Sequence, residues 1–218
     1  MPGSIAVGEA PSTAGQGKRE RLVAAACDVV YRYGVQRTTL ADIAEAADVP
    51  LGNVYYYFKT KDDLVAAVVQ THVDQLGFAV AELERRHRAP KARLKALVGM
   101  IAEQGETITR YGCPYGTLSS ELTKRDDASS KALTARLMET LVGWVEEQFA
   151  ALGRRDARDC AIELVVAYQG AAVVGSALGK PEVMARGASR LKKWIDSLDT
   201  RTDRARHDGG HGRKGVTP

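Results

Sequence analysis

Residues 38–63 read TTLADIAEAADVPLGNVYYYFKTKDD, and this stretch decides the fold of the chain. Thr39 and Asp42 form a capping-box pair that opens a helix, because each side chain can bond the other residue's backbone N–H. Apolar residues then recur at the spacing of one helical face, at Leu40, Ile43, Ala44 and Ala47. The first part of the stretch is therefore predicted to be a short amphipathic helix.

The turn after this helix and the start of the next one are also marked. Asp48 stands where the first helix must end, and its short polar side chain tolerates the left-handed conformation of such a turn. Pro50 suits the first turn of the following helix, 51–57, because its missing N–H is not needed there. Thr60 and Asp63 open a third helix. A helix, a tight turn and a second helix form the geometry that places a recognition helix in the major groove of DNA.

The same stretch resembles the DNA-binding domain of the TetR family of one-component repressors. The resemblance covers roughly residues 18–65, and its matching positions are Thr38-Thr39-x-x-x-Ile43-Ala44-x-x-Ala47-x-Val49-x-x-Gly52-x-x-Tyr55-x-Tyr57-Phe58-x-x-Lys61-x-x-Leu64. Two positions depart from the family, which usually has Gly in place of Asp48 and often Ser or Thr in place of Pro50. The turn tolerates Asp48. Pro50 lacks the hydroxyl that could cap the recognition helix and touch a phosphate, so we assign it no contact.

Composition narrows the class of protein only in part. The 218 residues could hold one large or two small domains, 44% of them are hydrophobic, and the net charge of +4 favours an acidic partner weakly. Three cysteines without metal-ligand spacing, no signal peptide and no apolar run long enough to span a bilayer predict a reduced cytoplasmic protein with no membrane partner. We expect no metal site and no cofactor, since a phosphate-binding glycine loop is also missing.

The chain is predicted to be all-α, with about nine helices. Strand signals are nearly absent, and apolar residues recur at helical spacing in the segments 18–33, 60–86, 91–111, 114–123, 133–152, 156–178 and 181–198. Residues 1–17 and 200–218 have no such periodicity and are expected to be a disordered arm and a disordered tail. The resemblance implies a DNA-binding domain at 18–64 and a ligand-binding and dimerisation domain at 65–199.

The helix 51–57 is the one that the family uses for groove contacts. Val54 and Phe58 fit its core side, which leaves Leu51, Gly52, Tyr55 and Tyr56 nearer the exposed side. Packing of the small domain alone is the plainer interpretation of the tyrosines, and the resemblance favours contact with DNA. Gly52 would permit a close backbone approach, and Asn53 could pair with a base edge or face solvent.

Phosphate contacts are expected where helices begin. Thr38 and Thr39 lie at a helix N-terminus, where N–H groups and hydroxyls can hold a phosphate. Arg37, Lys59 and Lys61 flank the neighbouring helix starts. The predicted DNA-binding residues are therefore Arg37, Thr38, Thr39, Leu51, Gly52, Asn53, Tyr55, Tyr56, Lys59 and Lys61.

Polar and aromatic side chains at core-facing positions of the second domain predict a ligand pocket. Such groups are costly to bury unless they are bonded, so a cluster of them indicates a cavity with specific partners. The candidates are His72, Tyr111, Cys113, Trp144, Tyr168 and Gln169. We expect a mostly apolar pocket, closed on one side by the helix 60–86, that takes a small apolar or aromatic effector.

The resemblance implies a homodimeric regulator that represses by binding a palindromic operator in double-stranded DNA and is released by a small-molecule effector. The helices 157–178 and 182–198 would pack against their copies, and the small residues from Gly170 to Ala177, Ala171 and Gly175 among them, are compatible with close packing. Three alternatives stay open. Cys113, expected to be partly exposed at a helix start, could sense oxidants or electrophiles, or it could be the nucleophile of a helical enzyme. The chain could also be a helical interaction module that no longer binds DNA.

Overall fold

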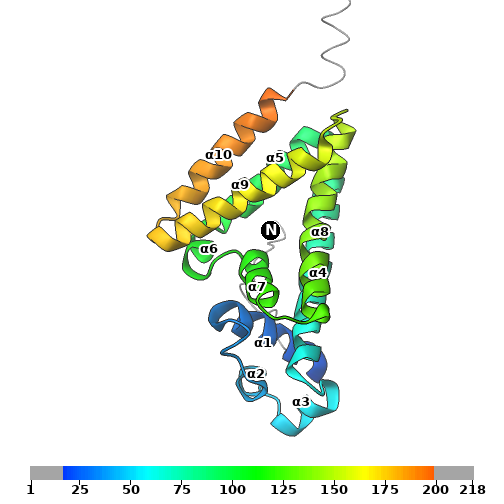
Figure 1. Ribbon diagram of the computed structural model, residues 1–218, viewed down its shortest axis with the longest axis vertical. Coiled ribbons are helices and arrows are strands. Elements are labelled where there is room, and N and C mark those ends of the chain that lie inside the picture. The colour runs from blue at the N-terminus through cyan, green and yellow to red at the C-terminus, as the bar shows by residue number, and fades with distance from the viewer. Residues whose placement is uncertain (1–16, 199–218) are drawn as a thin grey trace, which may run out of the picture.

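The structure, a computed structural model, describes residues 17–198, which form ten helices joined by short turns (Figure 1). The helices are α1 (Lys18–Tyr33), α2 (Leu40–Ala46), α3 (Leu51–Tyr57), α4 (Lys61–Arg86), α5 (Pro90–Glu103), α6 (Gly105–Tyr111), α7 (Pro114–Thr123), α8 (Ala128–Ala151), α9 (Ala157–Leu178) and α10 (Glu182–Ser197). The molecule is elongated: α1–α3 form a head at one end, α9 and α10 lie towards the other, and α4 and α8 run alongside each other between them. The all-α prediction is confirmed. The predicted disordered arm and tail, apart from Gly17, lie outside the described residues.

Local signals in the sequence shape the head. Thr39 caps α2, because its Oγ1 accepts the Asp42 N–H at 3.1 Å while the Asp42 carboxylate accepts the Thr39 N–H at 2.7 Å. Asp48 makes the turn between α2 and α3 with a φ of +50°, the left-handed conformation that the sequence predicts. The core of the head contains Leu22, Ile43, Val54, Phe58 and Leu64, all buried. A small apolar core thus fixes α3 against α1, α2 and the start of α4.

Helix α4 connects the head to the rest of the molecule. Thr60 and Asp63 form a second capping box at its start, with hydrogen bonds of 2.9 and 3.1 Å. The 26-residue helix buries one face from Leu64 to Leu83, packing on α1 within the head and on α5 and α8 beyond it. A single helix therefore contacts both parts of the chain.

The predicted helix 91–111 is divided in the structure into α5 and α6. The backbone leaves helical geometry at Gln104, with φ −90° and ψ 11°. Helix α10 approaches closely here, since a Cβ added to Gly105 would lie 3.6 Å from the Cβ of Met184. This contact joins segments far apart in the sequence, which hydrophobic periodicity does not report, and the break gives ten helices where about nine were predicted.

Small residues let α9 and α10 pack closely within one chain. A Cβ added to Gly187 would lie 3.0 Å from the Cβ of Ala171, and one added to Gly175 would lie 3.4 Å from the carbonyl oxygen of Lys180. The prediction that Ala171 and Gly175 face a second copy is therefore corrected, because both pack inside the monomer. The outward face of α9 instead carries five exposed apolar residues, Ile162, Val166, Val173, Val174 and Leu178.

Two helices, α4 and α9, are long and apolar enough to cross a membrane by length and composition, which differs from the prediction that no apolar run reaches this length. Their most apolar windows have mean hydropathies of 1.3 and 1.6, and 44% and 33% of the residues in these windows are buried. Both helices are packed in the fold, α4 against α1 and α8, and α9 against α8 and α10. These contacts and the outward stripe of α9 account for their apolar residues.

Candidate nucleic-acid interface and ligand pocket

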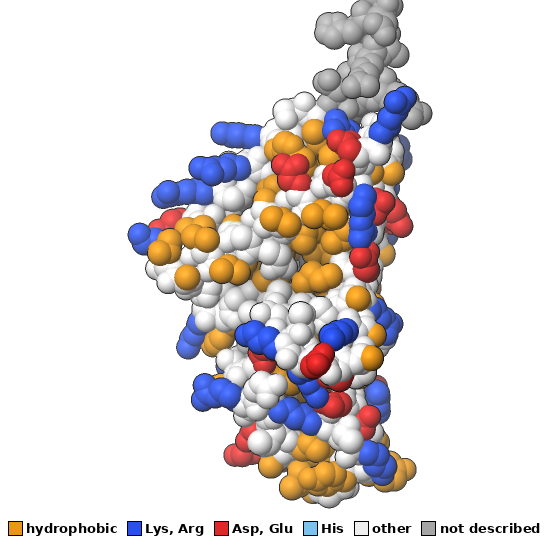
Figure 2. All heavy atoms as spheres, in the orientation of Figure 1, with side chains coloured by type: hydrophobic (Ala, Val, Ile, Leu, Met, Phe, Trp, Pro, Cys, Tyr) orange, Lys and Arg blue, Asp and Glu red, His pale blue; other side chains and the backbone are white. Residues whose placement is uncertain are grey.

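Helix α3 presents an aromatic and apolar face to solvent at the tip of the head (Figure 1, Figure 2). Tyr56 is 75% exposed, Tyr55 is 50% exposed and Leu51 is 41% exposed. A Cβ added to Gly52 would meet nothing within 4 Å, so the backbone is open to close approach at this position. The opposite side of the helix is buried through Val54. Apolar side chains gathered on one exposed face mark a surface that meets a partner.

Three basic side chains of the head, Arg37, Lys59 and Lys61, are at least partly exposed. Lys59 follows α3 and Lys61 begins α4, whereas Arg37 lies beside residues of α1 and α2. The Nζ of Lys59 donates to the carbonyl oxygen of Tyr55 at 3.0 Å, and the Nζ of Lys61 donates to that of Gln36 at 3.4 Å. An ammonium group has three donors. Each lysine is therefore held in place by the backbone while it keeps donors for a phosphate.

The two threonines before α2 have different environments. Thr38 is 1% exposed, and its Oγ1 donates to the carbonyl oxygen of Gly34 at 2.7 Å. The predicted phosphate contact of Thr38 is corrected, because its hydroxyl is enclosed and already bonded. Thr39 is exposed, but its hydroxyl donates to the Asp42 carboxylate at 2.8 Å. The hydrogen bonds from Thr39 lower the pKa of Asp42, so a phosphate at this helix start would meet a carboxylate that is already charged.

The start of α3 is held by a backbone hydrogen bond, and no side chain caps it. Asn53 is half-buried, and its N–H donates to the carbonyl oxygen of Pro50 at 2.8 Å. Pro50 is the N-cap residue and makes no side-chain hydrogen bond, in line with the missing hydroxyl at this position. Asn53 is thus less open to a partner than the tyrosines that follow it.

Three of the predicted pocket residues meet around one sulfur atom. The Sγ of Cys113 accepts hydrogen bonds from the hydroxyl of Tyr168 at 2.8 Å and from Nε2 of Gln169 at 3.4 Å. It also accepts the backbone N–H of Gly116 at 3.4 Å, because Cys113 is the N-cap of α7. Burial, and after it the electrostatic effect of Cys113, raises the pKa of Tyr168 well above its ordinary value. The hydroxyl therefore keeps its proton and donates. Cys113 is only 3% exposed, which corrects the prediction of a partly exposed thiol.

The other three predicted pocket residues lie apart from this cluster. Tyr111 packs towards α1. Trp144 donates from Nε1 to a carboxylate oxygen of Glu84 at 2.9 Å, which joins α8 to the end of α4. His72 is buried, and its ring meets that of Tyr115 edge-on with the centroids 5.5 Å apart. Burial lowers the pKa of His72 to about 4, so its imidazole is neutral at pH 7.

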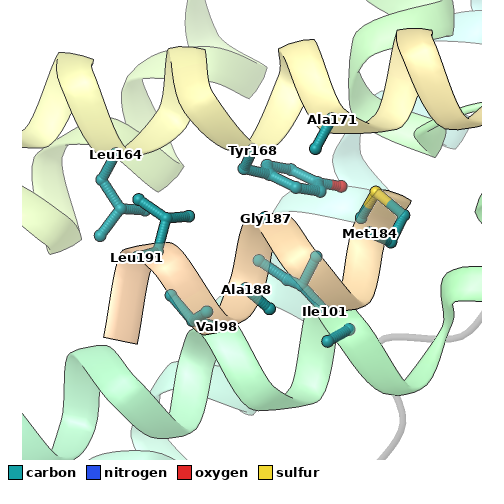
Figure 3. A pocket seen from close by; sticks show the side chains of 10 residues that line it. Val98, Ile101, Leu164, Tyr168, Ala171, Met184, Gly187, Ala188 and Leu191 are labelled. Carbon is teal, nitrogen blue, oxygen red and sulfur yellow. The ribbon is translucent and has the colours of Figure 1, made fainter. Parts of the chain in front are cut away.

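Two small cavities lie between the helices of the larger part of the molecule. The first, of about 10 Å³, lies between α5, α9 and α10, and its wall includes Val98, Leu164, Met184 and Leu191 (Figure 3). The second, also of about 10 Å³, lies where α4 to α9 meet, and its wall includes Leu76, Gln104, Ile108, Tyr115 and Leu141. Each has room for about one water molecule. Ile101 and Tyr168 line both cavities and thus form the wall between them.

The segment that carries Cys113 also touches the head. The hydroxyl of Tyr31 in α1 donates to the carbonyl oxygen of Gly112 at 2.7 Å, and the Tyr31 ring lies 5.6 Å from that of Tyr111. The N–H of Gln36 donates to the Glu121 carboxylate of α7 at 3.3 Å. A displacement of α7 would therefore reach the head through α1 as well as through α4.

Comparison with known proteins identifies the head. The sequence profile of "Bacterial regulatory proteins, tetR family" matches residues 22–68, which form α1–α3 and the start of α4. The chain belongs to the TetR family. Its members act as helix-turn-helix transcriptional regulators and are not enzymes, so the alternative of an enzymatic nucleophile at Cys113 is set aside.

Similar TetR-type proteins match the chain to different extents. An uncharacterized HTH-type transcriptional regulator in the lacX 3' region of Lactococcus lactis subsp. lactis is 29% identical over 136 residues, 62% of this chain and 69% of that protein. The HTH-type transcriptional regulator TtgR of Pseudomonas putida is 45% identical over 56 residues, which is 26% of this chain and only 27% of TtgR. A TetR transcriptional regulator from Chloroflexus aurantiacus has the same fold, with a TM-score of 0.72 and 20% identity over 86% of this chain and 98% of that one.

The sequence prediction missed most of the cavity wall of this TetR-family chain. Tyr115 and Gln104 line the cavity where α4 to α9 meet, together with aliphatic residues that look like ordinary core positions. Tyr115 could have been found, since it is an aromatic residue with a polar tip directly after the helix start at Pro114. The aliphatic residues carried no such signal.

Proposed function

We propose that the chain is a cytoplasmic TetR-family repressor that binds a palindromic operator as a homodimer and is released by a small-molecule effector. The observation that carries this proposal is the exposed face of α3, with Tyr55, Tyr56 and Gly52 open to a partner and Lys59 and Lys61 beside them. Aromatic and small residues suit a groove, and lysines suit the phosphates on either side.

The proposal assigns separate tasks to two parts of the chain. Residues 18–64 would bind DNA, and residues 65–199 would bind the effector and the second copy. The boundary falls inside α4, which packs on α1 before it and on α8 beyond it. A tilt of this helix would move the head, which makes α4 the proposed lever.

The dimer is supported by the outward face of α9. Its apolar stripe includes Val166 and Val173, which are 63% and 67% exposed. An exposed stripe of this kind on a helix is typical of a contact between protein surfaces. Two heads in such a dimer would need their recognition helices about 34–36 Å apart to read one face of DNA.

Release would follow from movement around the cavities. A ligand that enters near Tyr115 must displace α7, which is bonded to the head through Gly112 and Glu121. If the ligand binds more tightly to the displaced arrangement, the population shifts away from the spacing that fits the operator. Both α1 and α4 would carry this movement.

The experiment measures binding of the full chain to its own promoter and to an unrelated duplex over a range of salt concentrations. Lys61→Ala should lower the affinity for both duplexes and reduce the salt dependence of the affinity by about one phosphate contact. Tyr56→Ala should weaken promoter binding more than binding to the unrelated duplex. Lys193→Ala, an exposed lysine on α10, is the control and should change neither. Failure of the intact chain to bind any duplex in a salt-dependent way would refute the proposal.

A second route to release is reaction of oxidants or electrophiles at Cys113. Its position favours this route, because Cys113 bonds to Tyr168 of the cavity wall and adjoins Gly112, which bonds to the head. Burial of the thiol means that a reagent must first open the site. Cys113→Ser separates the routes: release by alkylating agents should disappear in this variant if the thiol is the sensor, and it should persist if the cavity alone responds.

A further inference from the structure

The cavity where α4 to α9 meet is lined by Tyr115, whose hydroxyl is buried without a hydrogen bond to any of the described residues. Tyr115 is 6% exposed, and its Oη has no partner among residues 17–198. Buried hydroxyls in folded proteins are nearly always bonded, because the lost bonds to water are otherwise not replaced. Burial also raises the pKa of Tyr115 above its ordinary range, so the group keeps its proton and remains a donor.

No charged side chain lines this cavity. Its polar atoms belong to Gln104, Tyr115 and Tyr168, and the rest of the wall is aliphatic or proline. The Tyr168 hydroxyl is already engaged with Cys113, and Nε2 of Gln104 donates to the carbonyl oxygen of Met100 at 3.3 Å. The nearest buried imidazole, His72 against the Tyr115 ring, is neutral at pH 7. An ion entering here would lose its hydration without gaining an opposite charge.

We propose that this cavity binds a neutral, mostly apolar molecule that carries one hydrogen-bond acceptor, such as an aromatic ketone, with the acceptor on the Tyr115 hydroxyl. The inference deepens the proposed function and rests on it in taking this molecule as the effector. The acceptor would bond the Tyr115 hydroxyl, which is buried without a partner among residues 17–198, and the apolar part would be covered by Leu76, Leu141 and their neighbours.

Such a molecule needs more room than the present space of about 10 Å³, which fits the proposed displacement of α7 on binding. Ile101 and Tyr168 also line the cavity between α5, α9 and α10, where Met184 lies beside them (Figure 3). Methionine is unbranched and adapts its shape readily. Movement of Ile101 and Met184 would enlarge the space on this side of the cavity.

The test uses the full chain and three probes of nearly the same shape. Benzophenone is a neutral aromatic ketone, diphenylmethane lacks its acceptor, and 4-benzoylbenzoate adds a negative charge. Calorimetry should show that benzophenone binds about tenfold or more tightly than either of the others, because one unmade bond to a buried donor is worth roughly that factor. Irradiation of bound benzophenone should cross-link it to peptides that carry Leu76, Ile101 or Tyr115. Equal binding of the three probes, no binding of benzophenone, or cross-links elsewhere would overturn the proposal.

Two variants of α7 separate binding from stability. Tyr115→Phe removes the unbonded hydroxyl and should keep the melting temperature unchanged or raise it. The affinity for benzophenone should fall about tenfold, whereas the affinity for diphenylmethane should stay the same. Ser119→Ala is the matched control, since Ser119 Oγ is also buried without a partner one turn later but does not line the cavity. It should leave the affinities for all three probes unchanged. Equal loss of benzophenone binding in both variants would show that the hydroxyl of Tyr115 has no special role.

Failure of this inference can be told apart from failure of the proposed function by measuring promoter binding in the same samples. If benzophenone is cross-linked in the cavity but promoter binding is unchanged, the cavity chemistry stands and effector-driven release is refuted. If charged molecules release the promoter while benzophenone neither binds nor cross-links, release stands and the assignment to neutral ketones is refuted.

Discussion

His72 should make the stability of this TetR-family chain fall as the pH is lowered. Its imidazole is 3% exposed between α4 and α7, and burial lowers its pKa from 6.5 to about 4. The unfolded chain takes up a proton at His72 below pH 6.5, whereas the folded chain does not do so until about pH 4. Because the unfolded state then binds more protons, acid favours unfolding. Stability from this group is present above pH 6.5 and is lost as the pH falls towards 4.

The size of the effect follows from the two pKa values. A difference of this size corresponds to a loss of about 2 kcal/mol of unfolding free energy at pH 5 and about 3 kcal/mol at pH 4, relative to pH 7 and above. The groups around His72 modify this figure. Gln75 offers a hydrogen bond that favours the charged ring of His72. Glu121 and Tyr31 line the same small cavity as His72, and Tyr115 stays neutral.

Urea unfolding of the wild-type chain and of His72→Asn between pH 7.5 and pH 4.5 checks this prediction. The difference in unfolding free energy between the two proteins should shift by about 2.5 kcal/mol over that range, with the wild type losing more. His87→Asn, at the end of α4, controls for removal of an imidazole elsewhere. A difference between wild type and His72→Asn that stays constant with pH would refute the reasoning.

Three further changes test the contacts that join parts of the molecule. Val173→Asp places a charge on the outward stripe of α9 and should give monomers by light scattering, whereas a persistent dimer would place the interface elsewhere. Tyr31→Phe removes the 2.7 Å hydrogen bond to Gly112 and should cost about 1 kcal/mol, seen as a melting temperature lower by about 2–4 °C; no change would mean that this bond does not hold the head. Thr60→Ala removes the N-cap of α4 and should also cost about 1 kcal/mol in unfolding free energy, with Thr60→Ser close to wild type. Equal losses in both Thr60 variants would count against the cap.

The sequence by itself determined the head of this protein. The capping pairs Thr39–Asp42 and Thr60–Asp63, the turn at Asp48 and the helical spacing of apolar residues all act within a few residues of one another. Such local signals depend on backbone geometry and on which face of a helix is apolar, and both can be read without a structure. The exposed side of α3 was predicted for the same reason.

Tertiary structure alone decided which side chains share a site. Thr38 is buried although its neighbour Thr39 is exposed, and the Sγ of Cys113 meets Tyr168 from a helix 55 residues away in the sequence. Gly175 faces α10 of its own chain, and the hydroxyl of Tyr115 has no partner within the part of the chain that the structure describes. These outcomes depend on how whole helices pack across the molecule, and a pattern along one helix carries no information about the helix that covers it.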